Sequence, residues 1–158
     1  QKIGGCSYYF NPTSGAMSSG WVTIKGKKYY LSSSGITLTG WQQIGGKWYY
    51  FNNSGVMQTG SVTVGGSKYY LNKNGVMQTG WQNVNGNWYY LNSKGAMQTG
   101  WLLKEGKYYF LNTDGTMAYG WVNSQGSWYY FQKPDGDMLT NAYAPDGRYV
   151  NAEGVLIQ

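Results

Sequence analysis

A repeat of 20 residues constrains the fold of this chain more than any other feature. A Gly-Trp pair begins at residues 20, 40, 80, 100 and 120, and Gly60-Ser61 fills the intervening step. Methionine follows the same spacing, and we expect Leu38 to take its place in the unit that lacks one. A fixed period of this length is typical of proteins whose units stack on their neighbours. The chain is therefore predicted to be an array of similar units.

Each unit has the pattern of a β-hairpin followed by a loop. Residues 41–60 read WQQIGGKWYYFNNSGVMQTG. Residues 41–44 predict one strand and residues 47–51 predict a return strand rich in aromatic residues. Gly45-Gly46 fits a two-residue type I′ turn, which requires positive φ at both positions.

This two-residue turn also fixes which side chains share a face of the hairpin. Residues directly opposite each other in an antiparallel pair point to the same side. One face is predicted to carry Trp41, Trp48 and Tyr50, and the other to carry Ile44, Tyr49 and Phe51. An isolated hairpin cannot bury both faces and is only marginally stable. We therefore predict an all-β fold, a β-solenoid of about seven hairpin repeats with atypical end units.

The same spacing predicts where the solenoid begins and ends. Residues 1–138 are expected to form it, with repeats starting near 20, 40, 60, 80, 100 and 120. Residues 1–19 look truncated, with only a return strand at Cys6–Phe10, so we expect the chain to be a segment of a longer protein. Residues 139–158 contain no tryptophan and are predicted to be a divergent C-terminal capping repeat.

The composition argues against catalysis, metal binding and membrane insertion. The chain has no histidine, a single cysteine, and no acidic residue among residues 1–104. Hydrolases need carboxylate pairs, activated nucleophiles or metals, so we expect no catalytic residue, no metal site and no cofactor. No stretch of 18 apolar residues predicts a transmembrane helix. The net charge of +6 is compatible with an anionic partner, or with lysines that only keep an aromatic surface soluble.

The paired tryptophans are the strongest candidates for a binding function. Tyr49, Tyr89, Tyr129 and Phe51 are interpreted as core residues, because they alternate with the tryptophans. Ring faces around a gap suit a quaternary ammonium, which has no hydrogen to donate and is held by cation–π attraction. Three such walls are expected to give about millimolar affinity. Several gaps acting on one polyvalent ligand would bind far more tightly.

Residues 80–100, GWQNVNGNWYYLNSKGAMQTG, closely resemble the choline-binding repeat of cell-wall-associated proteins from pneumococci, their relatives and their phages. The resemblance covers residues 4–138 well and the tail weakly. It implies a β-solenoid that recognises phosphocholine on teichoic and lipoteichoic acids. In the family, two Trp or Tyr residues of one hairpin and an aromatic residue of the next enclose the trimethylammonium group, often beside the loop methionine.

Applied to this sequence, the resemblance assigns four groups of choline-binding residues. They are Trp41 and Trp48 closed by Tyr70, with Met77 nearby; Trp81 and Trp88 closed by Phe110; Trp101 and Tyr108 closed by Tyr130; and Trp121 with Trp128, which lack a clear third ring. Substituting Trp48 or Trp88 with Ala should lower the choline stoichiometry, whereas Tyr69→Ala should mainly reduce stability.

Two repeats depart from the family pattern. Lys28 replaces a tryptophan beside Trp21, and Ser61 with Lys68 replaces both tryptophans of another unit. A lysine in the wall repels a cation. We therefore expect these two gaps to be empty, or to bind phosphate or another anion.

The resemblance predicts a non-catalytic attachment module that is secreted and lies at the bacterial cell surface, with a wall hydrolase as one candidate for an attached domain. The alternative is a glucan-binding repeat module whose rings stack on sugars. Single-stranded nucleic acid is disfavoured, because the lysines are scattered among turns rather than aligned with ring faces. A purely structural spacer is compatible with either reading, and the sequence leaves open whether the chain forms a homodimer.

Overall fold

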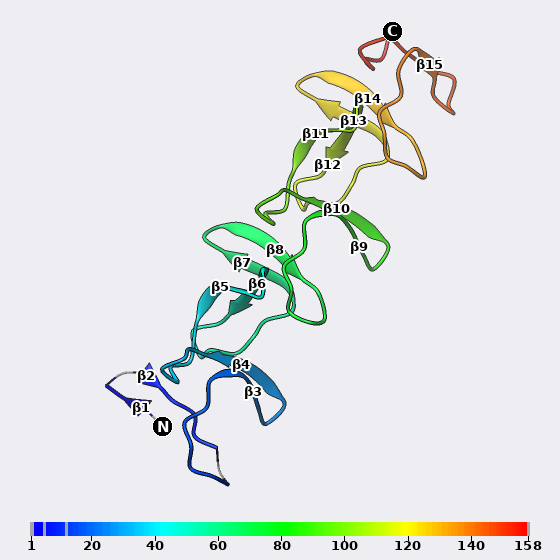
Figure 1. The fold of residues 1–158 in the computed structure, drawn as a ribbon. Helices are drawn as coiled ribbons and strands as arrows, with labels where there is room; N and C mark the ends of the chain where they lie inside the picture. Colours follow the sequence, from blue (N-terminus) through cyan, green and yellow to red (C-terminus); the bar gives the residue numbers. More distant parts are fainter. Residues whose placement is uncertain (1, 5, 12, 158) are drawn as a thin grey trace. The chain divides into compact units, whose positions relative to one another are not determined.

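The computed structural model describes residues 2–4, 6–11 and 13–157, which form two compact units, residues 1–78 and 79–158 (Figure 1). Gln1, at the start of the truncated first repeat, lies outside the described residues. The described parts of both units consist of β-strands, turns and loops without any helix, which confirms the all-β prediction. Accordingly, no described helix could cross a membrane.

Six hairpins with five-residue strands make up most of the two units. They are β3 (Gly20–Ile24) with β4 (Lys27–Leu31), β5 (Gly40–Ile44) with β6 (Lys47–Phe51), β7 (Gly60–Val64) with β8 (Ser67–Leu71), β9 (Gly80–Val84) with β10 (Asn87–Leu91), β11 (Gly100–Lys104) with β12 (Lys107–Leu111), and β13 (Gly120–Ser124) with β14 (Ser127–Phe131). Two shorter pairs lie near the ends of the chain: β1 (Lys2–Ile3) with β2 (Cys6–Ser7), and β15 (Ala142–Tyr143) with β16 (Tyr149–Val150).

The turns and the strand register agree with the sequence pattern. In the β5–β6 hairpin, Gly45 and Gly46 have φ of 57° and 75°, as a type I′ turn requires. Asn85, at the first turn position of the β9–β10 hairpin, has a φ of 53°. Trp41 lies opposite Tyr50, so the predicted face of Trp41, Trp48 and Tyr50 is confirmed.

The core is a row of one residue per hairpin, the last residue of each return strand. These side chains are 0–2% exposed: Leu31, Phe51, Leu71, Leu91, Leu111, Phe131 and Val150. Full burial of a side chain of this size contributes about 1.5–3 kcal/mol. In most units a bridge joins this residue to the loop methionine, as between Phe51 and Met57. In the unit that lacks the methionine, Thr37 rather than Leu38 makes the bridge, to Leu31, because the bridge position is six residues beyond the core residue.

Three loop methionines, Met57, Met117 and Met138, also connect their own repeat to both neighbouring repeats. The Met57 N–H donates a 2.8 Å hydrogen bond to the carbonyl of Lys28 in the preceding hairpin. The Met57 Sδ lies 2.5 Å from where a Cβ at Gly75, in the following loop, would stand. Gly75 also has φ of +81°, which disfavours other residues. Two independent constraints therefore require glycine at this loop position.

The N-terminal unit differs from its prediction. A two-residue strand, β1, precedes β2, so the first repeat is not limited to a return strand. Of the expected strand Cys6–Phe10, only Cys6–Ser7 pairs continuously with a neighbouring strand, β1. Beyond it, Tyr8 and Phe10 each form a single isolated β-bridge. The chain diverges here because Tyr8 pairs with Ile36 and Phe10 pairs with Met17, two different segments.

Candidate functional site

Neighbouring hairpins stack front to back within each unit. The face that carries the first-strand tryptophan meets the opposite face of the next hairpin, where the first tyrosine of the Tyr-Tyr pair lies. The ring centroids are 4.7–5.0 Å apart, with the rings steeply inclined, in the pairs Trp21–Tyr49, Trp41–Tyr69, Trp81–Tyr109 and Trp101–Tyr129. These T-shaped pairs are the favoured geometry for two aromatic rings. Each gap between hairpins is thus walled by an indole and a phenol from different repeats.

The structure therefore corrects the identity of the predicted closing rings. The rings that contact the tryptophans of the preceding hairpin are Tyr69, Tyr109 and Tyr129, not Tyr70, Phe110 and Tyr130. The prediction assumed that like faces meet, whereas front-to-back stacking brings opposite faces together. The residue that follows each closing tyrosine instead lies opposite the first-strand residue of its own hairpin, as in the pairs Tyr70–Ser61, Phe110–Trp101 and Tyr130–Trp121.

The three displaced residues have clear structural places of their own. Tyr130 packs on Trp121 at 5.2 Å, within the β13–β14 hairpin. Phe110 contacts Trp101 at 5.5 Å and Phe131 at 6.1 Å. Tyr70 lies opposite Ser61, where other hairpins have a tryptophan. Two of these residues, Phe110 and Tyr130, thus pack on the tryptophan of their own hairpin.

The gap at Trp81 and Trp88 forms a cavity of about 230 Å³, lined by Trp81, Trp88, Tyr109, Met117, Pro134 and Asp135. The two indoles are 6.5 Å apart and nearly perpendicular, at 88°. Met117 is held beside Trp88 by a 2.7 Å hydrogen bond from its N–H to the Trp88 carbonyl. Trp88 is 37% exposed, so a ligand can reach the cavity from solvent. The result is a small apolar pocket with ring faces on three sides.

The same framework recurs at two further gaps. The Met77 N–H donates a 2.8 Å hydrogen bond to the Trp48 carbonyl. Met77 therefore lies next to Trp48, as the sequence predicted. In the gap of Trp101, the Tyr108 ring takes the place of the second indole, at 6.2 Å and 86°. Trp48 and Tyr108 are 41% and 46% exposed. Both gaps therefore keep an exposed second wall.

The gap at Trp21 has the same framework with a cation built into it. Its cavity of about 330 Å³ is lined by Trp21, Val22, Thr23, Lys28, Tyr49, Met57 and Asn74. Lys28 pairs with Thr23 across the hairpin, as Trp48 pairs with Gln43 in the next one, so the lysine replaces the exposed indole. No residue between 1 and 104 is acidic, so the cavity carries an ammonium group without a carboxylate from this region.

At the last full hairpin, an arginine takes the place of the closing tyrosine. Arg148 lies two residues before buried Val150, as Tyr129 lies two residues before buried Phe131. Its guanidinium carbon is 4.2 Å from the centre of the Trp121 ring. Asp146 accepts hydrogen bonds from the Trp121 indole N–H at 2.8 Å and from the Arg148 Nε at 2.9 Å. The Arg148 bonds, followed by the indole bond, lower the pKa of Asp146 to about 2.

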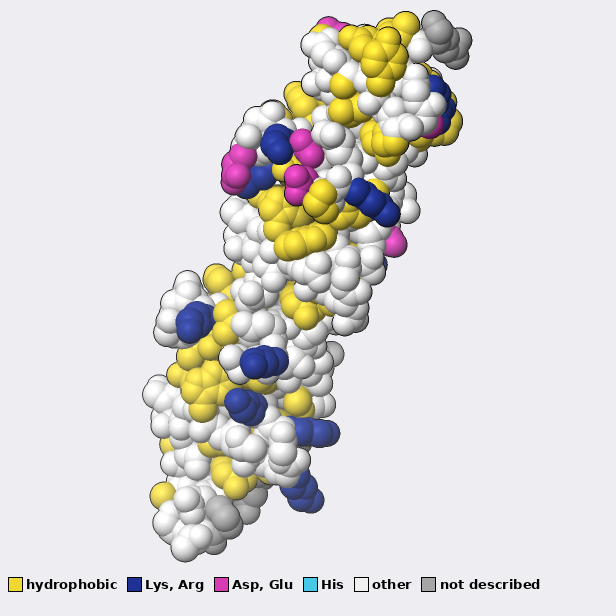
Figure 2. All heavy atoms as spheres, turned by 90° about the vertical axis from the view of Figure 1, so that its right-hand side faces the viewer, with side chains coloured by type: hydrophobic (Ala, Val, Ile, Leu, Met, Phe, Trp, Pro, Cys, Tyr) yellow, Lys and Arg dark blue, Asp and Glu magenta, His cyan; other side chains and the backbone are white. Residues whose placement is uncertain are grey.

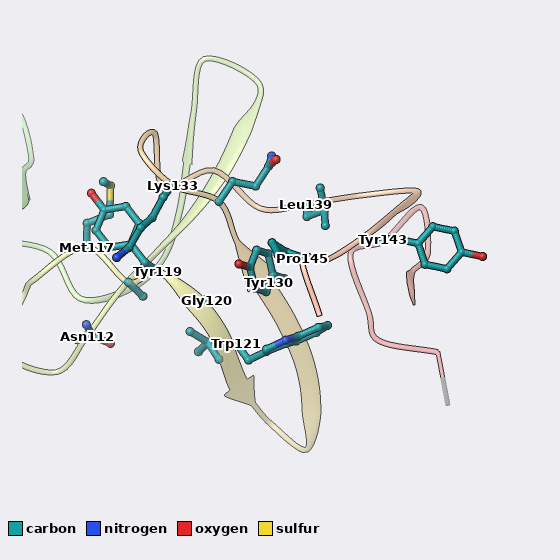
Figure 3. A pocket seen from close by; sticks show the side chains of 13 residues that line it. Asn112, Met117, Tyr119, Gly120, Trp121, Tyr130, Lys133, Leu139, Tyr143 and Pro145 are labelled. Atoms are coloured by element: carbon teal, nitrogen blue, oxygen red, sulfur yellow. The ribbon is translucent and has the colours of Figure 1, made fainter. Parts of the chain in front are cut away.

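This arrangement changes the prediction for Trp121 and Trp128. A cation from the chain itself already occupies one face of Trp121, and Trp128 remains 44% exposed. Trp121 also lines a cleft of about 830 Å³. Figure 3 shows this cleft from close by. Trp121 and Tyr130 lie at its centre beside Pro145, Tyr119 and Lys133 lie at one end, and Tyr143 points away at the other.

The second unit also carries all the acidic side chains. Figure 2 shows acidic groups beside a hydrophobic patch in the upper half of the view. In the lower half of that view, the charged groups that can be seen are all basic. Lys107 Nζ lies 3.2 Å from the Asp137 carboxylate, and this hydrogen bond raises the pKa of Lys107. Burial, followed by the charge of Asp135, raises the pKa of Tyr119. Among the described residues, no group of three His, Cys, Asp or Glu side chains could hold a metal ion.

Sequence reasoning missed three kinds of site residue. The closing tyrosines follow their tryptophans by 28 residues in every pair, but the adjacent tyrosine made the choice ambiguous by one position. Asp135 stands beside a loop glycine and has no counterpart in the aromatic pattern, although it lines the Trp81 cavity. Arg148 could not be matched to the closing tyrosines in the sequence, because the shortened β15–β16 hairpin shifts it out of the 20-residue period.

Comparisons with known proteins identify the repeat. A family model described as a choline-binding repeat matches residues 38–78, 78–114 and 104–143, and a putative cell wall binding repeat matches residues 19–36. No curated protein sequence matches the chain. Among solved structures, choline binding protein F of Streptococcus pneumoniae, determined in the presence of a peptidoglycan analogue, is 42% identical over 98% of this chain, with a TM-score of 0.90.

Two other solved structures from the same organism share the fold. CbpJ is 39% identical over 99% of the chain, with a TM-score of 0.93. The modular autolysin LytC matches 91% of the chain at 24% identity and a TM-score of 0.64, with 39% of its own length covered. The chain spans only 56% and 57% of the structures of choline binding protein F and CbpJ.

Proposed function

Because this chain belongs to the choline-binding repeat family, we propose that it is a non-catalytic module that attaches to bacterial cell walls by binding phosphocholine. The phosphocholine is that of teichoic and lipoteichoic acids. The module is secreted and works at the cell surface. A wall-acting catalytic domain elsewhere in the full protein fits this role, since the chain spans about half the length of the structures it matches.

One observation carries this proposal, the cavity between Trp81, Trp88, Tyr109 and Met117. A trimethylammonium group cannot donate a hydrogen bond, so a site for it needs electron-rich ring faces and apolar contact with its methyl groups. Three ring faces and a polarizable thioether around a cavity of about 230 Å³ supply both. The cavity opens to solvent, so the phosphate can remain outside while the head group is enclosed.

Three gaps combine the required walls. They belong to Trp41 with Trp48 and Tyr69, Trp81 with Trp88 and Tyr109, and Trp101 with Tyr108 and Tyr129. Each ring–cation contact contributes about 0.5–2 kcal/mol, so one gap binds choline in the millimolar range after association costs. The gap at Trp121 is not counted, because Arg148 already covers the ring.

Calorimetric titration with choline chloride tests the proposal, with tryptophan fluorescence as a second signal. We expect about three sites, and Trp48→Ala and Trp88→Ala should each remove one. Ile157→Ala is the control, since Ile157 is a 51% exposed hydrophobic residue that belongs to none of the three gaps. Dextran should neither bind nor displace choline. Saturable dextran binding with no choline response would replace the proposal with the glucan-binding alternative.

A further inference from the structure

The lining of the cavity at Trp81 and Trp88 includes a carboxylate. Asp135 lines the cavity of Trp81 and Trp88, although it comes from the loop two hairpins further along the chain. It directly precedes loop glycine Gly136. Asn74, which directly precedes loop glycine Gly75, lines the Trp21 cavity in the same way. The residue before the loop glycine is therefore a variable wall of the gap two hairpins earlier.

The basic groups near Asp135 make their closest contacts with other residues, although, after the hydrogen bond to Asp137, the charge of Asp135 also contributes to the raised pKa of Lys107. Lys107, the nearest basic group on β12, makes its salt bridge with Asp137 at 3.2 Å. The Lys133 ammonium lies 5.7 Å above the Tyr119 ring. Within the described residues, Asp135 is part of no salt bridge of 4.0 Å or less. Its negative charge therefore acts on the cavity that it lines as well as on Lys107.

We infer that Asp135 is a specificity-determining residue of the Trp81 gap, which draws the ammonium end of a ligand inward and keeps the phosphate end outward. This inference rests on the proposed function. A carboxylate adds Coulomb attraction for any cation in the cavity and repels an anion on the same ligand. The Trp81 gap therefore prefers a bare quaternary ammonium over phosphocholine more strongly than a gap without a carboxylate does.

The Trp41 gap supplies an internal comparison. Its ring walls Trp41, Trp48 and Tyr69 and its methionine Met77 all lie among residues 1–104, none of which is acidic. The contact between the first-strand tryptophan and the closing tyrosine is alike in both gaps, with centroid distances of 4.8 and 5.0 Å. A difference in ligand preference between these two gaps must then come from groups other than the rings.

The test uses the whole chain and reads each gap separately from the indole N–H signals of Trp48 and Trp88 in ¹⁵N NMR spectra. The probes are tetramethylammonium chloride and phosphocholine. In Asp135→Asn, we expect tetramethylammonium to bind the Trp88 gap about fivefold more weakly, with the Trp48 gap unchanged. The preference for tetramethylammonium over phosphocholine should fall at Trp88 only. Raising the salt concentration should weaken wild-type binding at Trp88 more than at Trp48.

Glu105→Gln is the control for net charge, since Glu105 is 82% exposed and pairs with Lys104 in a hairpin turn. It should change neither gap. The ratio of the two dissociation constants separates an electrostatic role from a loop defect, because a defect would weaken both probes alike. An unchanged ratio in Asp135→Asn, with binding retained, overturns the role of Asp135 alone. No tetramethylammonium response at any indole in the wild type overturns both this inference and the proposed function.

Discussion

The two adjacent tyrosines of each repeat have different tasks, although they are chemically identical. In the β7–β8 hairpin, Tyr69 packs on Trp41 of the preceding hairpin at 4.8 Å. Tyr70 points to the opposite face and pairs with Ser61 within its own hairpin. Adjacent strand residues point to opposite sides of a hairpin. One tyrosine therefore lines the gap to the preceding hairpin, and the other packs on the opposite face of its own hairpin.

This difference gives a prediction that separates the two rings. Tyr69→Ala should weaken choline binding at the Trp41 gap about tenfold, because it removes one ring wall worth roughly 0.5–2 kcal/mol. Tyr70→Ala should leave that affinity within a factor of two. Choline titrations followed at the indole N–H signal of Trp41 measure both. A larger effect for Tyr70→Ala would restore the closing ring that was predicted from the sequence.

Asp146 gives a pH prediction at the same scale. Its pKa is lowered from 3.8 to about 2 by the Arg148 hydrogen bonds, so the folded state favours the charged carboxylate. The stabilisation is fully present above about pH 4 and is lost as the pH falls through 2. The indole N–H signal of Trp121 should therefore shift between pH 4 and 2, and Asp146→Asn should abolish that shift. A wild-type signal that stays constant down to pH 2 would contradict this contact.

At the scale of the hairpin, a single residue decides whether a gap can accept a cation. The β3–β4 hairpin keeps Trp21, with Tyr49 of the next hairpin at 5.0 Å, but it has Lys28 in place of the second indole. We expect this gap to bind no choline, since an ammonium in the wall repels a second one. Its shape is otherwise that of the proposed choline gaps.

Lys28→Trp should therefore add one choline site. Calorimetry should show the stoichiometry rising from about three to about four, with an affinity similar to that of the existing gaps. Lys27→Trp is the matched control, because Lys27 is the adjacent exposed residue of β4 and points to the other face. An unchanged stoichiometry in Lys28→Trp would show that the framework of rings is not sufficient.

Hairpins could be predicted almost completely, whereas their stacking could not. The period, the glycine turns and the register all follow from local rules, and the structure confirms them in β5 and β6. How one hairpin is oriented against the next depends on two features that link residues far apart in the sequence. One is the burial of core residues such as Phe51, and the other is the hydrogen bond from a loop methionine such as Met57 to the preceding hairpin. If the other face of the β7–β8 hairpin met Trp41, Tyr70 would take the place of Tyr69 in the gap. The sequence alone therefore predicted the tryptophans at the gaps but not which tyrosine of the next hairpin contacts them.

For the molecule as a whole, weak gaps on one chain should act together on a polymer. Binding at one gap raises the local concentration of ligand at the others, so avidity can exceed single-site affinity by 10²–10⁴. We expect the wild type to be retained on a choline-bearing matrix and released by free choline at millimolar concentrations. The double variant Trp48→Ala with Trp88→Ala should lose most of this retention while its remaining gap keeps its monovalent affinity. Equal retention of wild type and double variant would show that the gaps do not cooperate.

The contact between a methionine sulfur and the glycine of the following loop bears on how such a chain can evolve. Five methionines place a thioether against the glycine of the following loop: Met17, Met57, Met97, Met117 and Met138. A gene segment that encodes one period therefore carries both halves of the junction. Unequal recombination can insert or delete whole copies without inventing a new interface, so the number of repeats is free to change while each junction stays the same.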